Sequence, residues 1–188
     1  MITRTAQGLK SIKPLVHTFL HEKFTLVISV YFFTFLGQAQ IDNKIGIGTI
    51  DSIQSTILDE KRKIWVYVPP DDGNSEKYEK QRYPVVFLLD GDFLFLQTAS
   101  IIQQLHPFWG NPVCPNMIVV GIPNTDRGRD LTATHAIYDP TDSTSGGGEN
   151  FISFIEKELM PYIDSKYPTE TYKTLVGHSL GGLAVMQL

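Results

Sequence analysis

The sequence predicts an α/β fold, in which antiparallel strands lead into a mostly parallel sheet flanked by helices. Two segments, 83–89 and 117–122, are apolar at almost every position, which is typical of strands that are covered on both faces. Helical candidates follow them along the chain, at 93–105 and at 151–166, and in the second candidate apolar residues recur at helical spacing. A third short apolar strand, 174–177, follows the second helix. This alternation of strands and helices indicates right-handed crossovers within one parallel sheet.

Two further strands are predicted before the first apolar one. Segments 49–58 and 63–68 have the composition of strands, and the charged stretch 59–62 separates them. Their short separation predicts an antiparallel pair. Pro161 should kink or interrupt the second helix near its end, because proline lacks the amide hydrogen and its ring clashes with the preceding turn.

The first forty residues differ in character from the rest of the chain. Four basic residues precede the apolar stretch 24–36, and small residues follow at Gly37 and Ala39. This is the layout of a secretory signal peptide. The apolar stretch is too short for a membrane span, which needs about 20 apolar residues. We expect cleavage after Ala39 and an exported protein, periplasmic or extracellular, which would contact the membrane only through an uncleaved signal anchor. The expected organisation is a signal peptide at 1–39, a linker at 40–48 and a domain at 49–188.

Charge and cysteine content bound the possible functions. The chain has 188 residues, of which 42% are hydrophobic, and this is ordinary for a globular protein. After residue 39 it has 12 basic and 19 acidic side chains, so no nucleic-acid partner is expected. The single cysteine, Cys114, cannot form an intrachain disulfide. Asp90 and Asp92 have no His or Glu at ligand spacing near them, so no metal site is expected.

Residues 177–182, with the sequence GHSLGG, have the pattern of a nucleophile elbow. They lie between the predicted strand 174–177 and a helix-compatible apolar segment that begins at Leu183. Glycines on both sides of Ser179 make a sharp strand-to-helix turn sterically possible, and such a turn exposes the serine as a nucleophile. The backbone amide of Leu180, at the start of the helix, would face the oxyanion formed on an attacked carbonyl. The alternative is a serine that only caps the helix.

A second oxyanion donor is expected from the loop Asp90-Gly91-Asp92, which directly follows the strand 83–89. Gly91 would allow the backbone to approach a ligand closely. An ordinary Asp-Gly turn is the alternative interpretation.

Two arginines follow the strand 117–122 and should lie at the same edge of a parallel sheet. Arg127 and Arg129 are candidates for binding a carboxylate or phosphate of the substrate. The alternative is a structural one, in which an arginine and Asp130 pair to stabilise the loop.

Several segments in a fixed order together resemble the putative esterase branch of the α/β-hydrolases, over roughly residues 50–188. This branch includes esterase D-like proteins, enterochelin esterases, feruloyl esterases and mycolyltransferases. The resemblance implies that Ser179 is the nucleophile, that the backbone amides of Asp92 and Leu180 form the oxyanion hole, and that no cofactor is needed. The implied partner is a small-molecule ester, such as a sugar, siderophore or other acyl ester. The segments are YPVVFLLDGD from Tyr83, VVGI from Val119, RGRDLT from Arg127, the helix 151–167 and the elbow.

The resemblance also implies that members continue past the elbow with further strands, a catalytic Asp or Glu and a histidine. His106 and His135 precede Ser179, and in this chain order neither is expected to be the base. The domain is therefore expected to be the N-terminal portion of an α/β-hydrolase fold, incomplete at its C-terminus, and the chain an inactive fragment of a serine carboxylic-ester hydrolase. A non-catalytic binding domain on the same scaffold and an acyltransferase are the alternatives.

Overall fold

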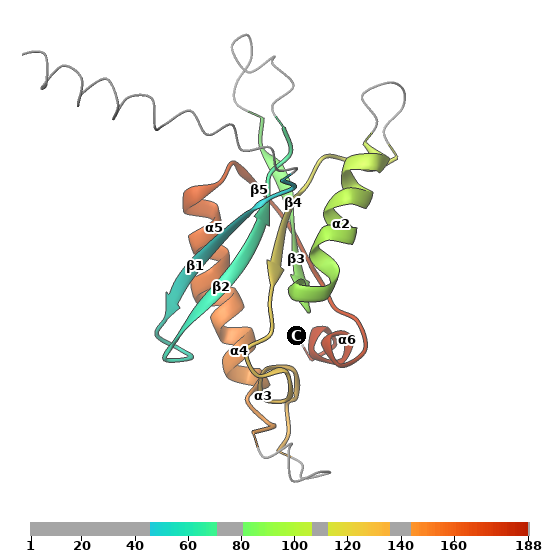
Figure 1. Cartoon of the computed structure of the whole chain (residues 1–188). Coiled ribbons are helices and arrows are strands. Elements are labelled where there is room, and N and C mark those ends of the chain that lie inside the picture. Colours follow the sequence, from blue (N-terminus) through green and yellow to red (C-terminus); the bar gives the residue numbers. More distant parts are fainter. Residues whose placement is uncertain (1–45, 71–80, 107–112, 136–143, 188) are drawn as a thin grey trace, which may run out of the picture. The chain divides into compact units, whose positions relative to one another are not determined.

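A five-stranded mixed sheet forms the centre of the protein (Figure 1). The computed structural model describes residues 46–70, 81–106, 113–135 and 144–187. The strands are β1 (Thr49–Ser55), β2 (Glu60–Tyr67), β3 (Tyr83–Leu89), β4 (Ile118–Ile122) and β5 (Thr169–Val176), in the order β1-β2-β4-β3-β5. The helices are α2 (Gly91–Leu105), α3 (Arg127–Leu131), α4 (Gly148–Phe154), the π-helical segment η1 (Ile155–Leu159), α5 (Met160–Lys166) and α6 (Leu180–Val185). The predicted α/β class is confirmed.

The strand directions bring three strand ends to one edge of the sheet. β1 and β2 are antiparallel, as expected, and β2 pairs antiparallel with β4. β3 lies between β4 and β5 and is parallel to both. The carboxyl ends of β3, β4 and β5 therefore meet at the same edge, the position where open α/β sheets bind ligands.

Helices cover both faces of the sheet, which explains why β3 is apolar throughout. Val85, Phe87 and Leu89 point to one face, where they pack in a core that includes Phe154 of α4 and Leu159 of η1. Val86 and Leu88 point to the other face, where they pack in a core built with Phe95, Ala99 and Ile102 of α2. Figure 1 shows α2 on one side of the sheet and α4 with α5 on the other.

The long helix 148–166 changes its hydrogen-bonding geometry in the turn before Pro161. Its first part is α-helical, residues 155–159 are π-helical, and α-helical geometry returns from Met160. Pro161 has no amide hydrogen to donate and its ring would clash with the carbonyl of Lys157. The predicted interruption thus takes the form of a π segment, and the helix continues beyond it to Lys166.

Glu158, in the π segment, joins this helix to the turn between β1 and β2. Its carboxylate accepts hydrogen bonds from Ser55 Oγ at 2.5 Å, from the amide of Thr56 at 2.9 Å and from the amide of Ile57 at 3.2 Å. The Thr56 hydroxyl donates to the same carboxylate. Burial raises the pKa of Glu158, but these hydrogen bonds outweigh it and hold the pKa below its ordinary value. The edge of the sheet formed by β1 and β2 is thereby fixed to the helical layer.

Asp51 makes a second connection between β1 and the helical layer, and it should make stability depend on pH. It accepts hydrogen bonds from Lys166 Nζ at 2.6 Å and from the Tyr162 hydroxyl at 2.8 Å. Burial raises its pKa, but these hydrogen bonds outweigh it and lower the pKa from 3.8 to about 2. Because the pKa is lower in the folded state, the contribution of Asp51 to stability is complete above about pH 4 and is lost as the pH falls towards 2.

We therefore expect Asp51→Asn to lower the free energy of unfolding at pH 6, and this difference from the wild type to shrink as the pH falls from about 4 to 2. Urea denaturation followed by circular dichroism at several pH values measures it. Since other carboxylates also titrate in this range, the quantity to compare is the difference between the two proteins at each pH. A difference that stays constant down to pH 2 would contradict the expected role of Asp51.

The predicted signal peptide 1–39 and most of the linker 40–48 lie outside the described residues. In the part of the chain that the structure describes, no helix combines the length and apolar character needed to cross a membrane.

Candidate active site

Ser179 lies at a sharp turn between the end of β5 at Val176 and the start of α6 at Leu180. Its backbone has φ 56° and ψ −119°, a conformation that a residue other than glycine adopts only under strain. The residue is exposed, and its side chain makes no capping hydrogen bond to α6. The serine therefore occupies the N-cap position of α6 without capping the helix. Its hydroxyl forms no hydrogen bond with another side chain or backbone group in the described part of the chain.

The glycines of the elbow are required because the turn is very tight. A Cβ atom on Gly177 would lie 2.3 Å from the backbone carbon and oxygen of Gly181. The turn is closed by hydrogen bonds from the amide of Gly181 to the carbonyl of His178, at 2.9 Å, and from the amide of Leu183 to the carbonyl of Ser179, at 3.0 Å. The sequence pattern thus corresponds to a close approach of two backbone segments.

The turn between β3 and α2 lies at the same edge of the sheet. Asp90 adopts φ 54° and directly precedes the first residue of α2, and its carbonyl accepts hydrogen bonds from the amides of Phe93 and Leu94. A Cβ atom on Gly91 would lie 2.5 Å from the amide nitrogen of Ile122, so only glycine fits where α2 starts against β4. Asp92 is exposed in the first turn of α2.

The Asp90 side chain joins this turn to the loop after β4, and the residue as a whole is 5% exposed. Arg127 donates to it from Nε at 2.7 Å and from Nη2 at 3.0 Å, and Asn124 donates from Nδ2 at 2.8 Å. The same Asn124 nitrogen lies 3.0 Å from Asp92 Oδ1. Burial raises the pKa of Asp90, but the hydrogen bonds from Arg127 and Asn124 outweigh it and hold the pKa below its ordinary value.

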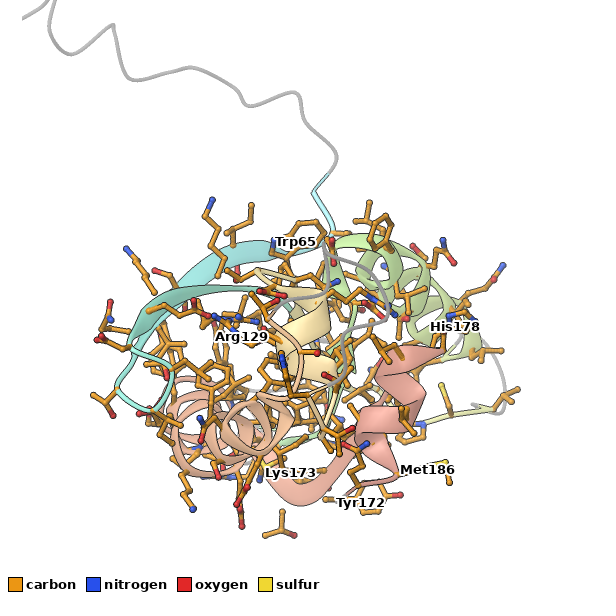
Figure 2. The ribbon with its side chains drawn as sticks, turned by 90° about the horizontal axis from the view of Figure 1, so that it is seen from below. Trp65, Arg129, Tyr172, Lys173, His178 and Met186 are labelled. Atoms are coloured by element: carbon orange, nitrogen blue, oxygen red, sulfur yellow. The ribbon has the colours of Figure 1, made fainter. Side chains whose placement is uncertain are left out.

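Arg129 belongs to a different cluster. It donates to Asp130 from Nε at 2.7 Å and to Glu60 from Nη2 at 2.8 Å. Asp130 in turn accepts from Nη1 of Arg62, at 2.7 Å. Figure 2 looks onto this edge from below and shows Arg129 on the side of β1 and β2, away from His178, which lies beside α2 and α6. The two candidate arginines are therefore both paired with carboxylates, and only Arg127 is joined to the turn that starts α2.

None of the three histidines in the described residues forms a hydrogen bond with Ser179. His106 Nδ1 lies 3.2 Å from the carbonyl of Cys114, and His135 Nδ1 lies 2.8 Å from the carbonyl of Ser145. His178 precedes the serine and is exposed. In the same part of the chain, no group of three or more His, Cys, Asp or Glu side chains is placed to bind a metal ion.

The chemistry available at this edge is that of a strained, exposed serine next to the first turns of two helices. Asp92 is the second residue of α2 and Leu180 the first of α6, and first-turn amides have no intrahelical acceptor.

Asn124 was not predicted from the sequence, although a polar side chain just after the apolar strand β4 is the kind of signal that could have indicated it. It connects the carboxylates of Asp90 and Asp92.

Comparison with known proteins assigns a family to these features. The family described as "Putative esterase" matches residues 55–188, which is more than half of the chain. Among curated proteins, the ferri-bacillibactin esterase BesA of Bacillus subtilis is 32% identical over 121 residues, covering 56% of this chain and 42% of BesA.

Two solved structures of serine and siderophore hydrolases are similar in fold. The IroE-like serine hydrolase from Shewanella oneidensis is 38% identical with a TM-score of 0.67, covering 74% of this chain and 45% of that one. The siderophore hydrolase EstA from Aspergillus nidulans is 26% identical with a TM-score of 0.60, covering 75% and 51%. The chain thus spans about half the length of these relatives, or less.

Proposed function

The chain belongs to the putative esterase family of α/β-hydrolases, and on this basis we propose that it is a serine carboxylic-ester hydrolase with Ser179 as its nucleophile. The observation that supports this most directly is the strained backbone of Ser179 on an exposed turn, where its side chain caps no helix. Strain of this kind persists only where the surrounding structure enforces it, and it is frequent at active sites.

In the proposed reaction, Ser179 Oγ attacks the ester carbonyl carbon while a base takes its proton. The carbonyl oxygen becomes an oxyanion, which the amides of Asp92 and Leu180 would stabilise by hydrogen bonds. The C–O bond to the alcohol then breaks, the alcohol leaves with a proton, and an acyl-Ser179 ester remains. Water hydrolyses this ester and restores the serine. An alcohol in place of water would give acyl transfer through the same intermediate.

A siderophore ester is the substrate class we propose to test first. The relatives described above include a ferri-bacillibactin esterase and a siderophore hydrolase by name. We also propose that residues 1–39 act as a signal peptide and that the domain works outside the cytoplasm, because a basic leader precedes an apolar stretch and small residues there.

We propose further that none of the histidines in the described residues is the catalytic base. The described histidines have other surroundings, and none forms a hydrogen bond with Ser179. Without its base, a triad hydrolase keeps only a small residual rate that comes from the oxyanion hole and substrate binding.

The test compares the 188-residue chain with a chimera in which the chain continues into the corresponding C-terminal part of the Shewanella oneidensis relative, which is 38% identical. The chimera should react with a fluorophosphonate at Ser179, as located by peptide mass spectrometry, and should cleave p-nitrophenyl butyrate. Both reactions should vanish in Ser179→Ala. The chain alone should react slower by a factor of about 10⁴ or more.

Other outcomes are equally informative. Circular dichroism and a cooperative thermal transition establish that the chimera is folded. A folded chimera that is labelled elsewhere, or not at all, would contradict the esterase proposal and favour a binding domain. Rapid Ser179-dependent turnover by the chain alone would show that its base lies within these 188 residues.

A further inference from the structure

We propose that Asp90, which Arg127 and Asn124 fix in place, is a positioning residue that sets the oxyanion loop against the nucleophile elbow. The inference rests on the proposed function of Ser179. It assigns Arg127 to the support of the site, in place of direct contact with the substrate.

Asp90 contacts three segments that are far apart in the sequence. Its own backbone starts α2, since its carbonyl accepts from the amides of Phe93 at 3.0 Å and Leu94 at 3.1 Å. Its carboxylate accepts hydrogen bonds from the loop after β4. Its Oδ2 atom also lies 3.1 Å from the point that a Cβ atom on Gly181 would occupy, so the carboxylate packs directly against the first turn of α6.

The hydrogen bonds leave the Asp90 carboxylate little freedom to move. Oδ1 accepts from Asn124 Nδ2 and from Arg127 Nε, and Oδ2 accepts from Arg127 Nη2. The Asp90 side chain is 7% exposed and that of Arg127 is 38% exposed. A paired, two-point contact between guanidinium and carboxylate specifies direction as well as distance. Asn124 extends this restraint to Asp92, whose Oδ1 accepts from Asn124 Nδ2 at 3.0 Å.

This arrangement argues against Arg127 as a substrate ligand. Turning the guanidinium towards a substrate anion would leave a nearly buried carboxylate without its cation, which is strongly unfavourable. As a support, the same ion pair fixes the relative position of two first helical turns, those that contain Asp92 and Leu180. Since a shift of about 1 Å in a catalytic group can reduce a rate a hundredfold, this contact should affect catalysis without touching the substrate.

Hydrogen–deuterium exchange on the 188-residue chain tests the coupling without any need for activity. Asp90→Asn keeps the size of the side chain but removes its charge. We expect the amides of Phe93 and Leu94, and across the contact those of Gly181 and Leu183, to exchange about tenfold faster than in the wild type. Amides in the β1–β2 pair should keep their exchange rates. The matched control is Asp164→Asn, because Asp164 is exposed on α5, where it pairs with Lys173 at 3.0 Å.

A kinetic arm separates positioning from substrate binding. It uses the Ser179-dependent hydrolysis rate of the chimera described above, obtained by subtracting the rate of its Ser179→Ala variant. Arg127→Met should lower kcat about tenfold or more for neutral p-nitrophenyl butyrate and for anionic p-nitrophenyl hemisuccinate alike, with little change in KM. Arg127→Lys should restore part of kcat, since a lysine keeps the charge but not the two-point contact.

Each outcome decides one of the two proposals. Unchanged exchange at Gly181 and Leu183 in Asp90→Asn, or faster exchange everywhere including β1 and β2, would overturn the positioning role. An Arg127→Met effect confined to KM for the anionic ester would overturn it in favour of substrate binding. A wild-type rate that does not depend on Ser179 would instead contradict the esterase proposal, and the exchange experiment would still decide on the positioning role.

Discussion

Gly91→Ala is expected to destabilise the protein by about 3 kcal/mol and to abolish reaction at Ser179, because the new methyl group meets backbone atoms of β4. It would lie 2.5 Å from the amide nitrogen of Ile122 and 2.6 Å from the carbonyl carbon of Gly121. Backbone within a sheet cannot yield as a flexible side chain would, so the start of α2 must move away. That turn contains Asp92, whose amide is the proposed oxyanion donor. Chemical denaturation measures the first effect and the fluorophosphonate labelling rate of the chimera measures the second.

Gly128→Ala is the matched control for this substitution. A Cβ atom there would meet only Asp126 Oδ1, at the ordinary contact distance of 3.7 Å. Since alanine is a better helix former than glycine, the variant should be as stable as the wild type or slightly more stable. If Gly91→Ala folds with wild-type stability and its Ser179 reacts at the wild-type rate, α2 does not need its close contact with β4.

Asp130→Asn is expected to lower the free energy of unfolding by about 3 kcal/mol, since it breaks a buried ion pair and leaves the buried Arg62 cation with the partly exposed Glu60 as its charged partner. Arg62 Nη1 lies 2.7 Å from Asp130 Oδ2, and the two side chains are 1% and 2% exposed. The Arg62 guanidinium also lies 5.2 Å from the ring centre of Phe151, so it cannot reach water without disturbing the core. A thermal melt should show a decrease in Tm of about 10 °C.

Glu60→Gln supplies the comparison within the same cluster. Glu60 accepts from Arg62 and Arg129 at 2.8 Å, but its side chain is 23% exposed and water can replace part of what is lost. We expect a loss of about 1 kcal/mol. Equal losses in the two variants would mean that burial of the Arg62–Asp130 pair does not determine its contribution.

The central strands and the elbow could be predicted from the sequence because their signals are local. Apolar residues at every position of β3 required cover on both faces, and the structure has α2 on one face and α4 with α5 on the other. The glycines on both sides of Ser179 indicated a tight turn. In the structure, the backbone of Gly181 lies so close to Gly177 that a Cβ atom on Gly177 would not fit. Both inferences depend only on the residues of the segment itself.

Elements whose signal depends on distant partners were misjudged. The charged stretch 59–62 was expected to separate two strands, yet β2 begins at Glu60 and Arg62 is fully buried. Arg62 continues the inward alternation of Ile64 and Val66, but a buried arginine is acceptable only with a partner, and Asp130 lies far away in the sequence. Pairing across the fold is invisible to a local pattern.

Two further elements escaped prediction because they lack apolar periodicity. β5 begins at Thr169, five residues before the predicted strand 174–177. Its first half has one buried residue followed by three exposed ones, so no apolar run indicates it in the sequence. α3 has only five residues, and its signal is the Asp126 side chain, which accepts from the amide of Arg129 at 2.9 Å. The clustering of Asp90, Asn124 and Arg127 likewise depends on the parallel pairing of β3 with β4.

The strand order has a consequence for synthesis on the ribosome. In the sheet, β2 pairs with β4, although β3 comes between them in the sequence. The hairpin of β1 and β2, which ends at Tyr67, is therefore synthesised roughly fifty residues before β4, which begins at Ile118. At about 5–20 residues per second, the nascent hairpin waits for roughly 3–10 s with one edge unpaired. Ile64 and Val66, which the finished core encloses completely, are exposed to the cellular environment throughout that interval. Until β4 follows, the edge of β2 that will pair with it is therefore open to association with strands of other copies.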